Sequence, residues 1–308
     1  MTQKKVKRGQ KAILALRNAT GLTTNEAKTV VYWAIATYGL KRLDCFPPLV
    51  IYGDIETGKS TILKFVSQLV GAEVISITSR AEFRDQLMEN RIVCIEEGDK
   101  VNEELILKRY SRESGQVHVK AKGPWGYTTT EGNLYGATVL HRRHSFEDVA
   151  VQSRTIIVKT KKVKREFYET ELSDDYKDKL RKLWKDAWKH RSSYMPLGRT
   201  ETNWWPLIIV AQFREDDEWI EYARKQQKIA ERLLKGDSEF EPDKVLGYAL
   251  NYFKNVRNKE FVYLSTLIEH LNDHYMWKPT SKRVAKILRE EMGYVVKHRK
   301  LGHAVKLS

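Results

Sequence analysis

The pattern of apolar and polar positions divides the chain into two parts. Up to about residue 160, short apolar runs alternate with longer amphipathic stretches, as in strands that alternate with helices. The predicted strands are 49–52, 73–77, 91–95, 134–140 and 154–159. From about residue 164, amphipathic helical patterns follow one another, at 173–190, 203–213, 217–234 and 242–254. The sequence therefore predicts an α/β core with a parallel sheet, followed by a helical part.

Two segments flank this central region. Residues 1–11 contain five basic residues and no acidic one, which predicts a mobile basic arm. A helix is expected at 25–38, with Asn25 as its cap. The predicted organisation is 1–46 for the arm and N-terminal helix, 47–160 for the core, 161–258 for a helical lid and 259–308 for a small C-terminal domain.

The C-terminal domain has a pattern of its own. Two helices are expected at 262–271 and 280–289, followed by two short strands at 294–297 and 304–307. On the second helix, Val284, Ile287 and Leu288 form an apolar stripe, because they recur at helical spacing. The basic residues of that helix, which include Lys282, Arg283 and Lys286, lie largely outside the stripe.

The first chemical signal is a complete G-x-x-x-x-G-K-S motif at 53–60. It stands between the predicted strand 49–52 and a predicted helix at 60–70, which is the context that a phosphate-binding loop requires. Backbone amides curl around the phosphates, the lysine reaches the β and γ oxygens, and the serine ligates Mg²⁺. ATP and Mg²⁺ are therefore the predicted cofactors, held by Gly53, Glu56, Thr57, Gly58, Lys59, Ser60 and Thr61.

The second signal is the acidic pair Glu96-Glu97, which ends the apolar strand 91–95. That strand is expected to lie beside the strand that leads into the motif loop. Glu96 would hold Mg²⁺ together with Ser60, and Glu97 would polarise the attacking water.

Composition narrows the range of partners. The formal net charge is +15, with 55 lysines and arginines against 40 acidic residues, which favours nucleic acid first and a membrane surface second. With only Cys45 and Cys94, neither a disulfide scaffold nor a cysteine zinc site is expected, and a cytoplasmic location fits. No apolar run approaches the length that spans a membrane, so no membrane partner is expected.

The motif loop and the acidic pair together make residues 45–258 resemble the AAA+ ATPases. In most members of that family an aspartate stands where this chain has Glu96. The resemblance implies a sensor residue near the γ-phosphate, either His141 or Thr138. It also implies that Arg154, which ends the segment 145–154, reaches the nucleotide of a neighbouring subunit, and that Arg199 acts as the lid arginine called sensor 2.

A narrower resemblance lies in residues 199–211, which are similar to the lid of ATPase domains in primase-helicases of plasmids, viruses and integrated mobile elements. It implies a homo-oligomeric ring, with a hexamer expected. Ring helicases of this kind insert a β-hairpin into their pore, and residues 115–130 have a hairpin pattern around Gly-Pro-Trp-Gly. Lys120, Lys122 and Trp125 would then contact single-stranded DNA. An ordinary solvent-facing hairpin is the open alternative.

The C-terminal pattern of helix, helix and basic hairpin resembles a winged helix. The second helix would then enter the major groove of duplex DNA through Lys282, Arg283 and Lys286, and the wing would touch phosphates through Arg299 and Lys300. Winged helices also dock proteins, which is the alternative for this domain.

Two functions follow from these resemblances. The first is an ATP-driven DNA helicase or translocase in the replication of a mobile element, plasmid or virus. The second is an origin-binding initiator or helicase loader that uses ATP as a switch. No primase, zinc or nuclease constellation stands in the sequence, so a separate primase or initiator is a possible partner.

Overall fold

The computed structural model describes residues 9–76, 79–123, 126–146, 148–163, 173–193, 196, 198–234, 242–275, 279–290, 292–299 and 302–307. The chain forms two compact units. The first contains residues 1–142 and 153–228, and the second contains residues 143–152 and 229–308.

The first unit is built on a five-stranded sheet in which every neighbouring pair is parallel. Its strands stand in the order β2-β3-β6-β1-β7. They are β1 (Leu49–Tyr52), β2 (Val74–Ile75), β3 (Ile92–Ile95), β6 (Ala137–Arg142) and β7 (Ile156–Lys159). All five lie within or overlap the predicted strands, which confirms the mixed α/β core with a parallel sheet.

The order of the strands corrects one expectation. The strand that ends at the acidic pair, β3, is not the neighbour of β1, because β6 lies between them and pairs with both. The other neighbour of β1 is β7. Sequence pattern identifies strands but not their order, since the order depends on how the connecting helices cross the sheet.

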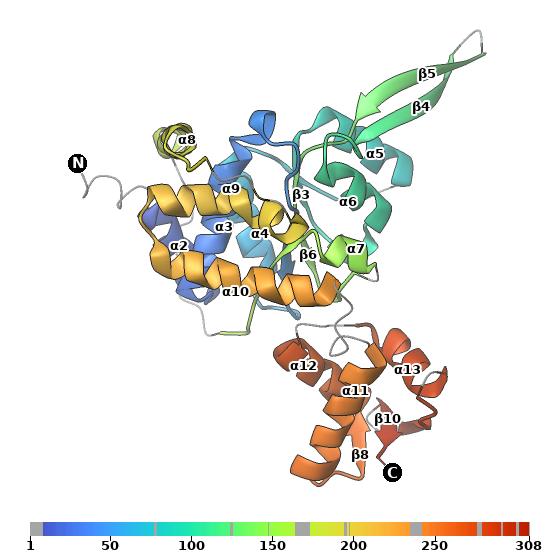
Figure 1. Cartoon of the computed structure of the whole chain (residues 1–308). Helices are drawn as coiled ribbons and strands as arrows, with labels where there is room; N and C mark the ends of the chain where they lie inside the picture. Colours follow the sequence, from blue (N-terminus) through green and yellow to red (C-terminus); the bar gives the residue numbers. More distant parts are fainter. Residues whose placement is uncertain are drawn as a thin grey trace. The chain divides into compact units, whose positions relative to one another are not determined.

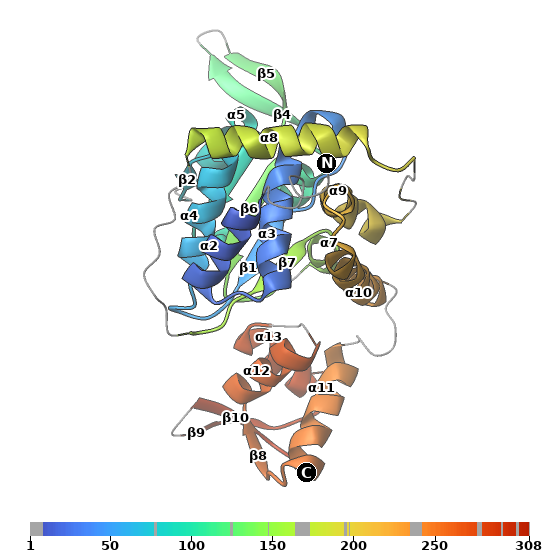
Figure 2. The ribbon, with the colours of Figure 1, turned by 90° about the vertical axis from the view of Figure 1, so that its left-hand side faces the viewer.

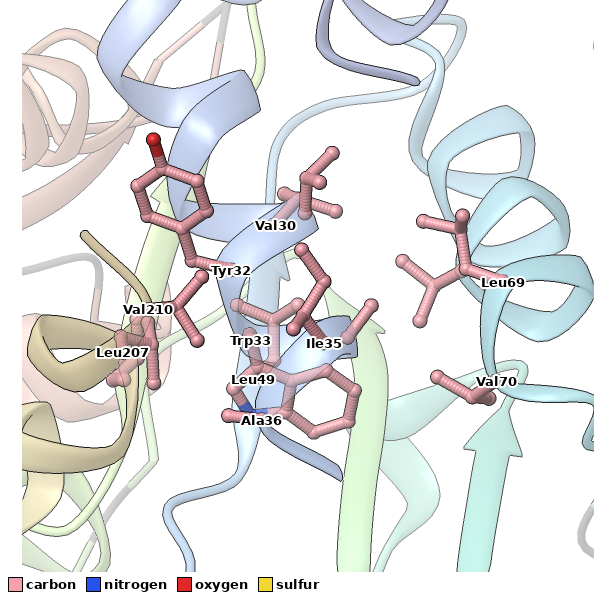
Figure 3. Packing of buried hydrophobic residues seen from close by; sticks show 14 of the residues in the cluster. Val30, Tyr32, Trp33, Ile35, Ala36, Leu49, Leu69, Val70, Leu207 and Val210 are labelled. Atoms are coloured by element: carbon pink, nitrogen blue, oxygen red, sulfur yellow. The ribbon is translucent and has the colours of Figure 1, made fainter. Parts of the chain in front are cut away.

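Helices pack around this sheet (Figures 1 and 2). Helix α4 (Lys59–Val70) contacts β1, β2, β3 and β6. Helix α3 (Thr24–Thr37) contacts α4, α8 (Asp174–Lys189), α9 (Arg199–Phe213) and β7. Figure 3 shows α3 between α4 and α9 (Arg199–Phe213), with Trp33 and Leu49 in the packed layer between them. All four residues of β1 are buried, as expected for a strand covered on both faces.

The helices that follow the sheet belong to the same core. Helix α8 (Asp174–Lys189) contacts α9, and buried residues of α8, α9 and the start of α10 (Asp217–Leu234) share one hydrophobic cluster with α3 and α4. The predicted lid, 161–258, is therefore divided: its first three helices contribute to the core of the first unit, whereas α11 (Pro242–Asn251) lies in the second unit.

The N-terminal region differs in detail from the expectation. Helix α2 (Gln10–Thr20) includes Lys11, and residues 1–8 of the predicted basic arm lie outside the described residues. Helix α3 is capped by Thr23 rather than by Asn25. The Thr23 side chain accepts a hydrogen bond from the Glu26 amide, and the Glu26 carboxylate accepts one from the Thr23 amide at 2.8 Å. This reciprocal pair is a capping box.

The predicted hairpin is present as β4 (Gln116–Gly123) and β5 (Gly126–Asn133), and it extends away from the rest of the first unit (Figure 1). Its antiparallel register runs from Gln116 opposite Asn133 to Gly123 opposite Gly126. Helices α5 (Arg80–Glu89) and α6 (Glu103–Tyr110) precede it in the chain, and the latter begins soon after the acidic pair.

The second unit contains α11, α12 (Leu264–Tyr275), α13 (Ser281–Glu290) and a three-stranded antiparallel sheet of order β8-β10-β9. Its strands are β8 (Phe261–Tyr263), β9 (Val296–Arg299) and β10 (Gly302–Lys306). The predicted apolar stripe of Val284, Ile287 and Leu288 is buried, as expected. The unit begins before residue 259, because α11 packs on α12 and α13 and shares their hydrophobic cluster.

Candidate functional site

The motif loop follows the carboxyl end of β1, and its backbone demands glycine at two positions. At Gly53 a Cβ would lie 1.9 Å from the Thr160 Oγ1, so no larger residue fits there. Gly58 has a φ of +90°, in the left-handed region that favours glycine. Glu56 also has a positive φ, of 64°, and its carboxylate pairs with Lys162 at 2.7 Å. A non-glycine residue in this region indicates local strain of the kind found at functional sites.

Hydrogen bonds hold the loop in shape. The Thr160 hydroxyl lies 3.0 Å from the Tyr52 carbonyl and 2.7 Å from the Thr57 Oγ1, and the Thr57 hydroxyl donates to the Asp54 carbonyl at 2.9 Å. Thr57 and Thr160 are both buried. Thr160 had no role in the sequence prediction, and only its place directly after a strand could have indicated one.

Lys59 is the first residue of α4 and is 8% exposed. Its ammonium group donates a hydrogen bond to the Asp54 carbonyl, across the loop. Gly58 gives the helix no side-chain cap, so the first amides of α4 face the loop with the positive end of the helix dipole. Ser60 is exposed and Thr61 is half-buried. This arrangement can bind a phosphate group.

The acidic pair lies at the carboxyl end of β3, on the same edge of the sheet as the loop. Glu96 is half-buried, and its amide donates to the Ile75 carbonyl at 3.0 Å. Glu97 is exposed, has a φ of 56° and forms an ion pair with Lys100. The two carboxylates therefore stand in different surroundings, since one lies against the sheet and the other in solvent.

His141 is on β6 and lies opposite Ile51 of β1. The motif loop begins two residues after Ile51, at Gly53. Burial lowers the pKa of His141, the charge of Lys59 lowers it further, and Glu96 and Asp99 act in the opposite direction. The imidazole therefore lies close enough to Lys59 of the motif loop and to Glu96 of the acidic pair to be affected by the charge of each. Its Nε2 atom is buried and has no hydrogen-bond partner among the described residues. Such an atom suits a polar ligand group.

Thr138, the alternative sensor, occupies another environment. It is fully buried and lies opposite Val93, away from the carboxyl edge of the sheet. Its Oγ1 accepts a hydrogen bond from the Arg109 Nε at 2.8 Å. Thr138 therefore contributes to the core, and of the two residues only His141 stands near the loop.

Arg142 links the motif loop to the residues that follow the acidic pair, and the sequence analysis did not predict this role. Its guanidinium, 6% exposed, lies 3.6 Å from the Asp99 carboxylate and 3.4 Å from that of Glu103. Its carbonyl accepts the Gly53 amide at 3.3 Å. The close packing of this turn is also seen at Gly98, where a Cβ would lie 2.6 Å from the His141 carbonyl oxygen. One residue thus connects β6, the loop and the start of α6.

Arg154 and Arg199 lie at the opposite, amino-terminal edge of the sheet. Arg154 precedes β7, and its guanidinium stands 5.6 Å from the centre of the Tyr110 ring. The Tyr110 hydroxyl donates to Asn203 on α9 at 2.7 Å, one turn after Arg199. Burial chiefly raises the pKa of Tyr110, while the charges of both arginines lower it. Both arginines are thus grouped around Tyr110, apart from this chain's own loop.

The predicted DNA contacts lie on two elements. Lys120 and Lys122 are on β4, opposite Thr129 and Tyr127, and Trp125 lies outside the described residues. In the second unit, Lys282 and Lys286 are exposed on α13 and Arg283 is half-buried. Arg299 ends β9, and Lys300 lies outside the described residues. A groove of about 540 Å³ between α13 and β10 is lined by Lys282, Lys286, Arg289 and His303 among others.

The described residues contain neither a metal-binding cluster nor a helix that could span a membrane. Among the described residues, no group of three or more His, Cys, Asp or Glu side chains is placed to hold a metal ion. In the same part of the chain, every helix is too short or too polar to cross a bilayer.

Comparison with known proteins gives little. No protein-family model and no curated protein sequence matches this chain. Two apo structures of the C-terminal region of NrS-1, one covering residues 305–718, align with it at a TM-score of 0.33 and 10% identity. Each alignment covers 100% of this chain and 76% of the other. A similarity of this size supports no conclusion about function.

Proposed function

We propose that this chain is an AAA+ ATPase that forms a ring and moves along or unwinds DNA during replication of a mobile element, plasmid or virus. The observation that carries the proposal is the grouping at the carboxyl edge of the sheet. The motif loop, the buried Lys59 and Glu96 belong to that edge, as does the Nε2 atom of His141, which has no hydrogen-bond partner in the described part of the chain. In open parallel sheets, ligands bind outside this edge.

Each group at the edge has a role in phosphoryl transfer to water. When bound, ATP with Mg²⁺ would supply the phosphoanhydride and a cation that neutralises phosphate charge. Ser60 and Glu96 would hold the cation, and Lys59 would neutralise the β and γ oxygens. Glu97 would orient the water after leaving its ion pair with Lys100. The lowered pKa of His141 keeps its imidazole neutral at pH 7, suited to a hydrogen bond with a phosphate oxygen.

Arg154 would complete the site of a neighbouring copy. It stands beyond the amino end of β7, whereas the loop follows the carboxyl end of β1, and the two strands are parallel. Four residues of strand, about 10 Å, separate the two edges. An arginine at the far edge cannot act on its own chain's nucleotide without rearrangement, but a head-to-tail ring brings it to the next subunit. Arg199, in the same group, would act in the same direction.

DNA binding is proposed at two places. The projecting hairpin would carry Lys120, Lys122 and Trp125 to a single strand. In the second unit, α13 and the β9–β10 hairpin would form a winged helix that holds duplex DNA. The exposed lysines of α13 and its buried apolar stripe favour this reading of the helix.

The test is ATP hydrolysis measured without DNA, with single-stranded DNA and with forked DNA. The wild type should be stimulated by single strands, while Lys59→Ala and Glu97→Gln should lose hydrolysis. Glu96→Gln should raise the Mg²⁺ concentration needed for half-maximal hydrolysis, whereas Glu97→Gln should not, which separates the roles of the two carboxylates. Slow turnover that ignores single strands, with tight binding to one duplex, would instead support the initiator or loader.

Mixing two inactive variants tests the role of Arg154. Lys59→Ala keeps its arginine, and Arg154→Ala keeps its loop, so an interface between the two variants can be complete. At equal amounts and random assembly, about a quarter of the interfaces pair an intact loop with an intact arginine. Recovery of hydrolysis on mixing is expected, and no recovery would contradict action in trans.

A further inference from the structure

The outer face of α8 carries lysines that the proposed function does not use. Lys182, Lys185 and Lys189 are all exposed. Lys185 and Lys189 follow Lys182 by three and seven residues, so all three lie on one side of the helix. Lys182 and Lys189 are about 10 Å apart along the helix axis. The other side of α8 is fixed to the first unit through Leu180, Leu183 and other core residues.

These three lysines have no ion pair among the described residues, which distinguishes them from other helix lysines. Lys108, Lys179 and Lys225 each pair with a carboxylate four residues earlier, at 3.2 Å for the first and 3.0 Å for the last. Two acidic residues do stand near the three lysines. Asp178 is bound by Arg181 at 2.7 Å, and Asp186 is half-buried.

An aromatic cluster extends the same surface. Trp188, on α8, packs against Trp205 with ring centres 5.8 Å apart. The Arg191 guanidinium lies 4.1 Å from the centre of the Trp188 ring, and that of Arg42 lies 5.8 Å from it. Arg42 ends η1 (Leu40–Arg42), and its neighbour Lys41 is exposed. Stacking on the ring restrains the two guanidinium groups without neutralising them.

The chemistry of this surface indicates its partner. Protein interfaces are depleted in lysine and rely on exposed apolar anchors. Among the described residues the large exposed hydrophobic side chains all lie elsewhere, and both Trp188 and Trp205 are half-buried. Insertion into a membrane would also require an apolar face turned to solvent. Rows of unpaired cations with restrained guanidinium groups suit the phosphates of a nucleic acid.

We propose that the basic face of α8 and η1 binds the phosphate backbone of a nucleic acid strand, as a contact separate from the hairpin and from α13. The contact carries no base readout, because phosphate contacts position a strand without specifying its sequence. It also requires no nucleotide, so it stands or falls independently of the ATPase activity.

The experiment compares two triple variants of the full chain. The first carries Lys182→Gln, Lys185→Gln and Lys189→Gln, and the second changes the paired lysines 108, 179 and 225 to glutamine. Binding of a fluorescent 30-nucleotide oligo-dT is measured by anisotropy over a series of salt concentrations, without ATP. Each lost phosphate contact removes about 0.7 from the slope of log affinity against log salt.

The first variant should therefore lower the slope by about 2 and weaken binding about 100-fold at 0.1 M salt. The control should change the slope by less than about 0.5, although its net charge changes equally. A third variant with arginine at positions 182, 185 and 189 should restore the wild-type slope, which excludes a folding defect as the cause.

Two results would overturn the proposal. Equal weakening by the first variant and the control would mean that only diffuse net charge acts. In the second, poly-glutamate and unlabelled oligo-dT compete for the fluorescent oligo-dT at equal concentrations of negative charge. If poly-glutamate displaces it as effectively as oligo-dT does, the partner is an acidic protein. The Lys59→Ala variant should bind the oligonucleotide as the wild type does. The binding result can therefore be interpreted even if the ATPase proposal is wrong.

Discussion

Arg109 offers a test of how the first unit is held together. It is fully buried, and no carboxylate accepts a hydrogen bond from it among the described residues. Instead its guanidinium donates six hydrogen bonds of 2.8 to 3.2 Å to the Thr138 hydroxyl and five backbone carbonyls. The carbonyls belong to Leu87, Asn90, Arg91, Leu134 and Ala137, so one side chain joins α5, β3, β6 and the root of the hairpin.

Two opposing energies decide the effect of removing this side chain. Burial lowers the pKa of Arg109 from 12.5 to about 9, a cost of about 5 kcal/mol for holding the charge inside the protein. The five N–H groups of the guanidinium, at the low value of about 1.5 kcal/mol for each charged hydrogen bond, contribute about 7 to 8 kcal/mol. The difference predicts that Arg109→Met destabilises the first unit by about 2 to 3 kcal/mol. Its carbonyls would then be left without donors in the core.

The assay is urea unfolding followed by tryptophan fluorescence. Seven of the eight tryptophans belong to the first unit by position, so the signal reports mainly on it. Arg109→Lys keeps the charge but loses the planar set of donors, and should fall between the wild type and Arg109→Met. Arg112→Met is the matched control: Arg112 is partly exposed and donates to two carbonyls, so about 1 to 2 kcal/mol is expected.

A loss below about 1 kcal/mol for Arg109→Met would refute this reasoning. It would mean that the cost of burying the charge cancels the hydrogen bonds, as happens when some buried ion pairs are replaced by apolar residues. A loss equal to that of Arg112→Met would lead to the same conclusion.

Three further changes are predicted. Asp216→Asn should lower the free energy of unfolding by about 2 kcal/mol. Burial alone would raise the pKa of Asp216, but hydrogen bonds from Lys28 and Tyr32 hold it below its usual value. The stabilisation from these hydrogen bonds is therefore present above about pH 4 and is lost on further acidification. Acid unfolding should accordingly be less steep in that variant. Gly53→Ala should abolish nucleotide binding, because its Cβ would lie 1.9 Å from Thr160, whereas Gly198→Ala, with nothing within 4 Å, should bind normally in a titration with a fluorescent nucleotide. Arg142→Ala should lower stability by about 2 to 3 kcal/mol in the same urea assay, because it leaves Asp99 and Glu103 without their buried partner.

Local pattern was enough to predict the elements that carry the site. The loop at 53–60 stands between an all-buried strand and an amphipathic helix, and each of these signals is contained in a few neighbouring residues. The apolar stripe of α13 was predictable for the same reason. The capping residue of α3 was not, because Thr23 and Asn25 are both good capping residues and the choice depends on where the helix begins.

Long-range contacts explain what sequence could not predict. Arg142 reaches Asp99 and Glu103 only because β6 lies between β1 and β3, and that order is not encoded in any single strand. Thr160 supports the loop from a position more than a hundred residues away. Arg109 resembles an ordinary helix arginine until the strands around it are placed.

The direction of the strands finally decides which polar residues can share a site. Sequence analysis left His141 and Thr138 as alternatives, because Thr138 stands on the predicted strand 134–140 and His141 directly follows it. In a parallel sheet every strand delivers its last residues to the same edge, so His141 joins the loop while Thr138, three residues earlier, stays in the core with Arg109. The same polarity places Arg154 at the other edge. The polar residues that the sequence analysis assigned to one site are thus divided between the two edges of this chain's sheet.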